Sequence, residues 1–272
     1  METLSPSGAA SIDPRRIISL AHPLSSAMPI PGHASFSYEV VSPHRDGVGI
    51  PGADPRISDA TDRVTIGLHT GTHIDSLTHV AYDGLTHDGT DVRAQGAETS
   101  EGIETAGGNS LRPIISRGLL LDFTKLLDVP VIPDDFVIDA PALEACASAA
   151  GVKVEPGDTV LIRTGWDTLW SDPDRYLRPA SPGPNLSGAG WLIDRNVVAT
   201  GSDTMVYELM GAGSRPMDVH ADLLVRGGIF LLENLDLRAI SEVNGGAFTF
   251  IAVPLRLDRA TGSPIQPVAV IP

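Results

Sequence analysis

Residues 67–80 read GLHTGTHIDSLTHV, and this stretch holds three of the eight histidines in a chain of 272 residues. His69, His73 and His79 lie there within eleven positions, together with Asp75. Imidazole and carboxylate groups are the usual protein ligands of zinc and related divalent cations. Their density therefore indicates a metal site, a proton-transfer site, or both.

The backbone between the first two histidines must bend if they are to share an ion. In a fully extended chain, His69 and His73 would lie about 13 Å apart, whereas ligands of one metal each lie about 2 Å from it. Gly71 is the residue best able to bend. We predict a strand that ends near Leu68, a turn at Gly71, and a backbone that directs His69, His73 and Asp75 to one ion.

His79 lies four residues beyond Asp75, and two roles are open to it. It is either a fourth ligand or a free imidazole beside the metal. Neutral imidazole has a pKa near working pH, so a positioned histidine transfers protons readily. Metal-activated water next to such a histidine forms a hydrolytic apparatus, with His79 as general acid and base.

Two distant residues are candidates for further ligands. Glu233 ends the apolar run GIFLLEN (228–234), and a carboxylate on a buried strand is unfavourable unless a cation or hydrogen-bond donors meet it. His220 lies on a predicted helix whose Leu223 and Leu224 should face the core, so its side chain should point inward. Such a ligand set suits zinc or manganese, and the sequence does not choose between them.

Composition limits the classes of partner. The chain has 34 acidic and 19 basic residues, for a formal net charge of −15, so nucleic acid and anionic membrane surfaces are poor partners. No run approaches the ~20 apolar residues of a membrane span, and the N-terminus lacks the pattern of a secretory signal. We expect a cytoplasmic protein with a small-molecule substrate, a flexible tail at 1–15 and a single domain at 16–272.

The pattern of elements predicts a mixed α/β fold. Apolar, strand-like runs alternate with fewer helix signals and with long loops at 21–36, 83–113 and 171–188; the glycine-rich loop at 83–113 could be a lid over the histidines. The single cysteine, Cys146, is expected to be a small buried residue on one of the helices. The strand-like runs are 16–21, 37–41, 62–68, 118–123, 158–164, 196–201, 227–235 and 247–255, and the helix candidates are 139–151, 187–196 and 217–228.

Signals at the ends of two helix candidates are specific. The segment DAPALEACASAAG has Asp139 as a predicted N-cap and Gly151 just past its end. The segment MDVHADLLVRGG has Asp218 as a predicted cap and Gly227 as its end.

The segment HTGTHIDSLTH (69–79) resembles the His-x-Gly-Thr-His-x-Asp-x-Pro-x-His signature of the cyclase-like metal-dependent hydrolases. That family includes bacterial kynurenine formamidase and isatin hydrolase. Further segments are similar to other parts of the family, so that the resemblance covers most of residues 16–255. These are IISLAHPLSSAMPIPG (17–32), LIRTGW (161–166), VVATGSDT (197–204) and VHADLLVRGGIFLLENLDL (219–237).

The resemblance carries expectations for fold, assembly and chemistry. It implies a swivelling β/β/α domain with a mixed sheet and short helices, assembled as a homodimer or homotetramer. It implies hydrolysis of a C–N bond in a formamide, cyclic amide or imide, or of a related lactone. It assigns metal ligation to His69, His73 and Asp75 and acid–base catalysis to His79. His220 and Glu233 match residues that, in dinuclear members of the family, help to hold a second ion or lie close to it.

The family's proline is replaced by Leu77. Leucine leaves the backbone before His79 more freedom than proline and adds an apolar side chain near the site. With the loop at 83–113, this favours a substrate other than that of kynurenine formamidase.

Other side chains are candidates for substrate contact. Leu77 is one, Trp166 either lines an aromatic-binding pocket or packs in the core, and His87 either touches substrate or lies exposed on its loop. Asp203 either supports a ligand or forms a turn. His22 carries no functional signal of its own.

Two other function classes remain open. A non-haem iron oxygenase would use His73, Asp75 and His220 as its two-histidine, one-carboxylate set, but it leaves His69 and His79 without a role. A non-catalytic metal-binding protein would not need His79, which exceeds the requirement of a closed structural site.

Overall fold

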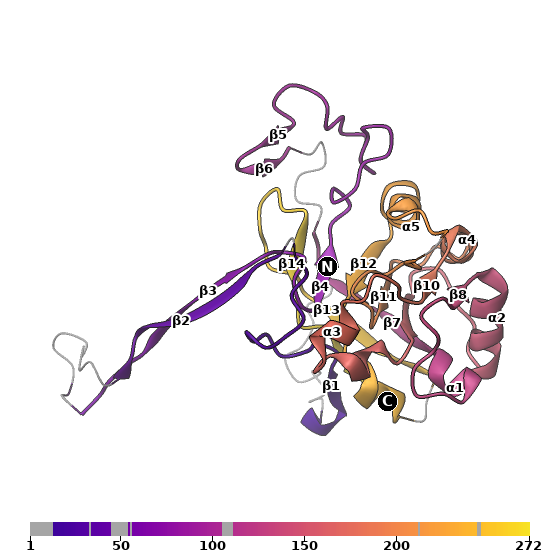
Figure 1. The fold of residues 1–272 in the computed structure, drawn as a ribbon, viewed down its shortest axis with the longest axis horizontal. Coiled ribbons are helices and arrows are strands. Elements are labelled where there is room, and N and C mark those ends of the chain that lie inside the picture. Colours follow the sequence, from indigo (N-terminus) through magenta and orange to yellow (C-terminus); the bar gives the residue numbers. More distant parts are fainter. Residues whose placement is uncertain are drawn as a thin grey trace, which may run out of the picture.

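A nine-stranded mixed sheet forms the centre of the computed structural model, which describes residues 13–32, 34–44, 54, 56–104, 111–211, 213–243 and 246–272 (Figure 1). The inner strands β7, β9, β11 and β12 are parallel, and the flanking pairs are antiparallel. In spatial order the strands are β1 (Ile17–Ser19), β15 (Val268–Val270), β13 (Ala247–Ala252), β7 (Ile114–Asp122), β9 (Thr159–Arg163), β11 (Ala199–Ser202), β12 (Phe230–Glu233), β4 (His73–Asp75) and β14 (Gly262–Pro264). The prediction of a mixed α/β fold is confirmed.

Three two-stranded sheets accompany it within the described residues. β8 (Val137–Ile138) pairs with β10 (Gly183–Pro184), and β5 (Glu98–Thr99) pairs with β6 (Gly102–Ile103). The third pair, β2 (Phe36–Ser42) and β3 (Thr61–Ile66), projects from the body as a long ribbon (Figure 1).

Helices cover one face of the parallel strands (Figure 1). A core cluster fills the space between them, and it includes Leu121, Val160, Leu192 and Leu223. A second cluster, with Phe248 and Phe250 among its members, fills the other side of the sheet. In the described part of the chain, no helix is both long and apolar enough to cross a bilayer. The helices are η2 (Pro14–Arg16), α1 (Phe123–Leu127), α2 (Ala140–Ala149), η4 (Trp166–Leu169), α3 (Pro173–Tyr176), α4 (Leu186–Asp194), α5 (Asp218–His220), η5 (Ala221–Arg226) and α6 (Arg238–Ser241).

The predicted signals of α2 are confirmed. The side chain of Asp139 accepts a hydrogen bond from the backbone N–H of Ala142, and Gly151 has a φ of 66° just past the end of the helix. Cys146 is buried on this helix, as expected.

The predicted helix at 217–228 differs in detail. Met217, with a φ of 71°, is the N-cap, and Asp218 is the first helical residue, so the prediction of Asp218 as cap is wrong. After His220 the backbone widens into the π-helix η5, which ends at Gly227 as predicted. The side chain of Glu208 accepts hydrogen bonds from the N–H groups at the start of α5. The local sequence of the helix does not reveal this contact.

The expected loops are partly structured. The segment 171–188 contains α3 and β10, and the described part of 83–113 contains β5 and β6; 105–110 lie outside the described residues. The role of the loop at 83–113 as a lid stays a prediction. Residues 1–12 of the expected tail also lie outside the described residues, and Asp13 already caps η2.

Candidate metal centre

The turn after β3 brings the histidines of the central segment together. β3 ends at Ile66, and Gly71 adopts a φ of 66°, a left-handed conformation that glycine takes without steric cost. The rings of His69 and His73 then lie with their centroids 5.2 Å apart, instead of at the separation of an extended chain. The predicted bend at Gly71 is confirmed.

Strand β4 carries His73 and Asp75 on one face of the sheet and buries them. The His73 Nδ1 atom lies 2.8 Å from the carbonyl oxygen of Gly71, which orients the ring with Nε2 toward Asp75 Oδ1 at 3.5 Å. His69 Nδ1 lies 2.7 Å from the same Asp75 oxygen. Asp75 is thus the common partner of both imidazoles.

The antiparallel pairing of β12 with β4 supplies the next carboxylate. Glu233 stands opposite His73 in the register, and its Oε2 lies 3.3 Å from His73 Nε2. His220 Nε2 lies 3.2 Å from Glu233 Oε1 and 3.7 Å from Asp75 Oδ2. The five residues predicted as ligands therefore converge, although they come from three separate parts of the chain.

This arrangement fits a divalent cation. His73 Nε2 and Asp75 Oδ2 are buried without a hydrogen-bond partner, and an unpartnered buried carboxylate oxygen is costly unless a cation meets it. Ligand atoms of His73, Asp75 and Glu233 lie within 4.8 Å of one another, and so do those of His69, Asp75 and His79. The two sets share Asp75, so the geometry accommodates one ion or two.

His79 lies at the edge of this centre. Its ring stacks on that of His69 with centroids 4.0 Å apart, and it lies 6.4 Å from the ring of His220. Burial lowers the pKa of His79, which favours the neutral imidazole. Both of its predicted roles, ligand and free imidazole, are compatible with this position.

The electrostatics of the ligand set favour bound protons in the absence of a cation. Burial is the largest influence on His73 and opposes its charge, but Glu233 and Asp75 outweigh it and raise its pKa to about 8. Burial also opposes the charge on His220, while Glu208 and Glu233 raise its pKa to about 10. Burial raises the pKa of Glu233, but His220 and His73 reverse this and bring it well below its usual range. Metal binding would therefore release protons.

Three residues at the centre were missed by sequence reasoning. The Oε2 atom of Glu208 lies 3.1 Å from His220 Nδ1, and the Oγ1 atom of Thr261 lies 3.0 Å from His69 Nε2. Asn234 Nδ2 lies 3.5 Å from His73 Nδ1, and its Oδ1 accepts a hydrogen bond from the Tyr176 hydroxyl at 2.8 Å. Glu208 interrupts the apolar stretch VYELM, which is the same signal that identified Glu233 and could have identified it too.

The predicted substrate-contact residues lie in different surroundings. Trp166 is fully buried and packs with Leu169 and Tyr176. This position agrees with core packing, one of its two predicted roles. Leu77 is partly buried between the two core clusters. His87 is exposed, and its Nδ1 lies 2.8 Å from the carbonyl oxygen of Val225, which docks its loop on η5.

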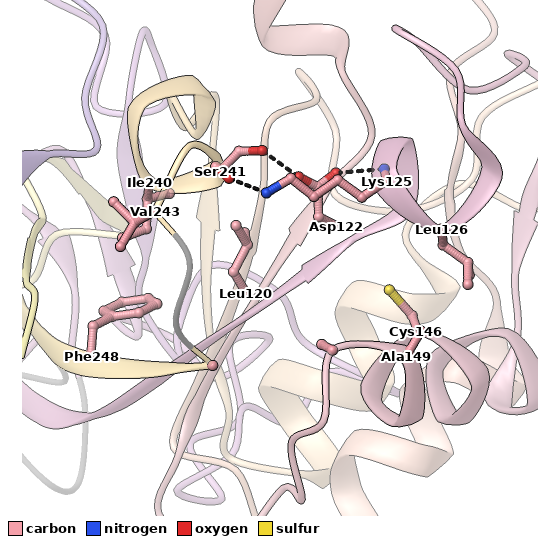
Figure 2. Close-up of a pocket in the computed structure, with 12 residues that line it drawn as sticks. Leu120, Asp122, Lys125, Leu126, Cys146, Ala149, Ile240, Ser241, Val243 and Phe248 are labelled. Atoms are coloured by element: carbon pink, nitrogen blue, oxygen red, sulfur yellow. Dashed lines mark hydrogen bonds between the residues drawn. The ribbon is translucent and has the colours of Figure 1, made fainter.

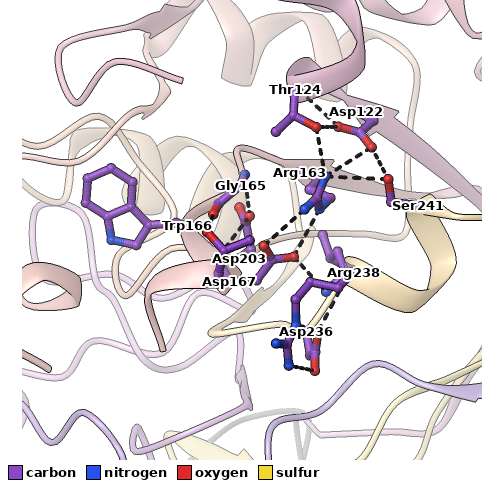
Figure 3. A network of polar contacts seen from close by, with 12 residues as sticks. Asp122, Thr124, Arg163, Gly165, Trp166, Asp167, Asp203, Asp236, Arg238 and Ser241 are labelled. Atoms are coloured by element: carbon purple, nitrogen blue, oxygen red, sulfur yellow. Dashed lines mark hydrogen bonds and ion pairs between the residues drawn. The ribbon is translucent and has the colours of Figure 1, made fainter. Parts of the chain in front are cut away.

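Asp203 belongs to a buried polar network (Figure 3). It accepts hydrogen bonds from the backbone N–H groups of Thr164 and Gly165, so it anchors the loop after β9. Arg163 in the same network contacts Asp122 and Asp167. The predicted roles of Asp203, support of a ligand or formation of a turn, stay predictions.

One cavity of the described structure lies away from the candidate ligands. It has a volume of about 290 Å³ between α1, α2, β7 and β13, with Leu120, Asp122 and Cys146 in its wall (Figure 2). None of the histidines lines it. Burial raises the pKa of the Cys146 thiol to about 12, which agrees with an inert packing residue.

Comparison with known proteins finds relatives of similar sequence and fold. The chain is 27% identical over 216 residues to isatin hydrolase of Roseibium aggregatum, which covers 77% of this chain and 74% of the relative. A crystal structure of a novel cyclase has a TM-score of 0.80 at 24% identity and covers 98% and 93% of the two chains, which shows the fold. An isatin hydrolase bound to the product analogue thioisatinate has a TM-score of 0.69 at 25% identity over 94% and 92%. Since the cyclase family model also matches residues 18–208, the chain belongs to the cyclase family.

Proposed function

We propose that this protein is a metal-dependent hydrolase that cleaves a C–N bond in a formamide, cyclic amide or imide, or opens a related lactone. The observation that carries the proposal is the buried convergence of three imidazoles and two carboxylates with two unpartnered ligand atoms. The similarity to isatin hydrolase supports an amide-type bond in a small molecule as the target.

His73, Asp75 and Glu233 would hold the cation, with His69 and His220 as further ligands of the same ion or of a second one. Nitrogen and oxygen ligands of this kind suit zinc or manganese. A divalent cation held by these residues would polarise a carbonyl oxygen and lower the pKa of a water molecule.

His79 supplies the proton transfer. The turn that carries it is fixed by the hydrogen bond from its own backbone N–H to the Ser76 carbonyl oxygen, at 3.0 Å. Its ring lies against His69, at the edge of the ligand set. A ring nitrogen of His79 takes a proton from the attacking group and returns it to the leaving nitrogen or oxygen.

Assembly and location complete the proposal. The protein would assemble as a homodimer or homotetramer. The ribbon of β2 and β3 supports this, because its side chains Tyr38 and Val64 are 56% and 49% exposed and would be buried against a second copy. A two-stranded ribbon with an apolar face is only marginally stable alone in water. A cytoplasmic location stays a prediction, which cell fractionation would test.

Elemental analysis of the purified chain, followed by a hydrolysis screen, tests the function. We expect zinc or manganese and turnover of at least one member of a set of formamides, cyclic imides, isatin-like lactams and lactones. Activity under exclusion of oxygen would separate a hydrolase from an oxygenase. Iron in the chain together with oxygen consumption would contradict the proposal.

The variant His79→Ala separates proton transfer from metal binding. We expect metal content to stay at the wild-type level, while hydrolysis falls by about 10²–10⁴-fold, the usual contribution of general acid–base catalysis. Metal content and kcat of the variant and the wild type, measured on the same preparations, check this. Wild-type turnover by the variant would exclude the acid–base role, and loss of metal would make His79 a ligand.

A further inference from the structure

Glu208 is a buried carboxylate that meets both the backbone and the ring of a candidate ligand. It lies in the segment before α5, and its residue is 2% exposed. Its Oε2 accepts hydrogen bonds from the backbone N–H groups of Val219 at 3.0 Å and His220 at 3.1 Å, and Oε1 accepts from that of Met217. The same Oε2 lies 3.1 Å from His220 Nδ1.

The chemistry of this contact determines which ring nitrogen faces the metal centre. An ionised carboxylate only accepts hydrogen bonds, so its partner on the imidazole, Nδ1, must carry a proton. The other nitrogen of His220, Nε2, is then directed at Glu233 Oε1 and Asp75 Oδ2. A metal-binding histidine needs this arrangement, with its proton on the nitrogen away from the ion.

The local backbone cannot fix His220 unaided. α5 has three residues, is preceded by Met217 in a left-handed conformation, and changes to a π-helix directly after His220. The N–H groups at its start have no partner within the helix and need an external acceptor. Glu208 satisfies them and the ring together, so one side chain sets both the backbone position and the ring orientation.

His73 offers a contrast within the same centre. Its Nδ1 is held by the backbone carbonyl of Gly71, a partner that no side-chain substitution removes. His220 depends instead on a replaceable side chain. We infer that Glu208 is a positioning residue, which holds His220 in the tautomer and orientation that present Nε2 to the cation.

The variant Glu208→Gln tests this inference. An amide has one acceptor oxygen and places donor hydrogens against Nδ1 or against the backbone N–H groups, so the favoured tautomer is lost. We expect the affinity for Mn²⁺, and separately for Zn²⁺, to fall about 10–100-fold in calorimetric titrations of the metal-free chain. Circular dichroism of the metal-free variant establishes that it is folded.

A matched control separates ring positioning from helix capping. Asp139→Ala removes the side-chain cap of α2, whose recorded partner is the backbone N–H of Ala142. It should lower the melting temperature without a change in metal affinity. If folded Glu208→Gln bound both ions with wild-type affinity and only melted earlier, Glu208 would be a helix cap and the inference would be wrong.

A second readout needs no change at Glu208. Nitrogen-15 NMR of the zinc-loaded wild-type chain, with the His220 signal assigned by its loss in His220→Gln, should show a proton retained on Nδ1. A proton on Nε2 would overturn the inference even if the proposed function holds. The inference rests on the proposed metal site, and a wild-type chain that binds neither ion would overturn both.

Discussion

Asp75 is the residue that the other ligands share. Its Oδ1 lies 2.7 Å from His69 Nδ1 and 3.5 Å from His73 Nε2, and its Oδ2 lies 3.7 Å from His220 Nε2. Burial raises the pKa of Asp75, but the hydrogen bond with His69 and the neighbouring imidazoles outweigh this and lower it. A single carboxylate therefore offers negative charge to every candidate position of the ion.

The variant Asp75→Asn should lose most of its metal. The amide keeps the size of the side chain but removes the charge and one acceptor, so we expect affinity to fall by at least the ~100-fold seen for outer-shell partners. Elemental analysis after dialysis against low metal measures the loss. Asp158→Asn is the control, because Asp158 is also buried but pairs with Arg117 away from the histidines. Full occupancy in Asp75→Asn would refute the ligand assignment.

His22 gives the chain a predictable response to acid. Its residue is 3% exposed, and its ring stacks on Trp170 at a centroid distance of 4.0 Å. Burial is the main cause that lowers its pKa from 6.5 to about 4, and nearby Asp236 only partly offsets this. The unfolded chain therefore binds the proton more tightly, and the stability from neutral His22 is present above pH 6.5 and lost as the pH falls through 4.

The variant His22→Phe should lack this response because phenylalanine keeps the ring and cannot be protonated. Between pH 7 and pH 4, the wild type should lose up to about 3 kcal/mol more unfolding free energy than the variant, at ~1.36 kcal/mol for each pKa unit. Urea denaturation of both proteins across this pH range measures their unfolding free energies. The contributions of the other titrating groups cancel in the difference between the two proteins. Parallel curves would show that His22 is not held neutral by the fold.

At the scale of elements, the turn between β3 and β4 decides whether the ligands meet. Gly71 is in the left-handed region, and a Cβ there would lie 2.6 Å from Leu24 Cδ2. Leu24 is a flexible side chain, so the larger cost of a substitution is the backbone conformation, about 1–2 kcal/mol. The turn is local, and for that reason the sequence could predict it.

The variant Gly71→Ala should therefore reduce both stability and metal affinity. Gly151→Ala is a close control, because Gly151 has the same φ of 66° but nothing within 4 Å of the added Cβ and lies at the end of α2. Both variants should lose about 1–2 kcal/mol of unfolding free energy, and only Gly71→Ala should bind Mn²⁺ or Zn²⁺ more weakly. Equal metal affinity in the two variants would mean that the turn does not position the ligands.

At the scale of the whole molecule, the ribbon of β2 and β3 has two different faces. Tyr38 and Val64 are directly opposite each other in the register and form an apolar pair, whereas the next pair, Glu39 and Arg63, is an ion pair at 2.7 Å on the other face. Alternate residues of a strand point to opposite sides. Exposed apolar side chains on a projecting ribbon are candidates for burial against a second copy of the chain.

If the proposed homodimer or homotetramer forms through this ribbon, the double variant Tyr38→Ser, Val64→Thr should release smaller species. The control Glu39→Gln, Arg63→Gln changes the opposite face of the ribbon and should keep the wild-type mass. Size-exclusion chromatography with light scattering, over a range of protein concentrations, distinguishes them. A wild-type chain that is monomeric at every concentration would contradict the assembly.

The sequence by itself determined which candidate ligands lie together in the central segment, because His69, His73, Asp75 and His79 fall within eleven positions. It also determined the element types, since the apolar runs of β7, β9, β12 and β13 and the caps of α2 depend on contacts between near neighbours. Glu233 could be predicted from the same local information, as a carboxylate in an apolar run.

The tertiary structure alone decided how these parts combine. The antiparallel register of β12 with β4 sets Glu233 beside His73, and the long-range contact of Glu208 with α5 sets the ring of His220. It also placed Trp166 in the core and replaced the expected regular helix after His220 with a π-helix. Such outcomes depend on packing between residues far apart in the chain, which no local pattern of side chains encodes.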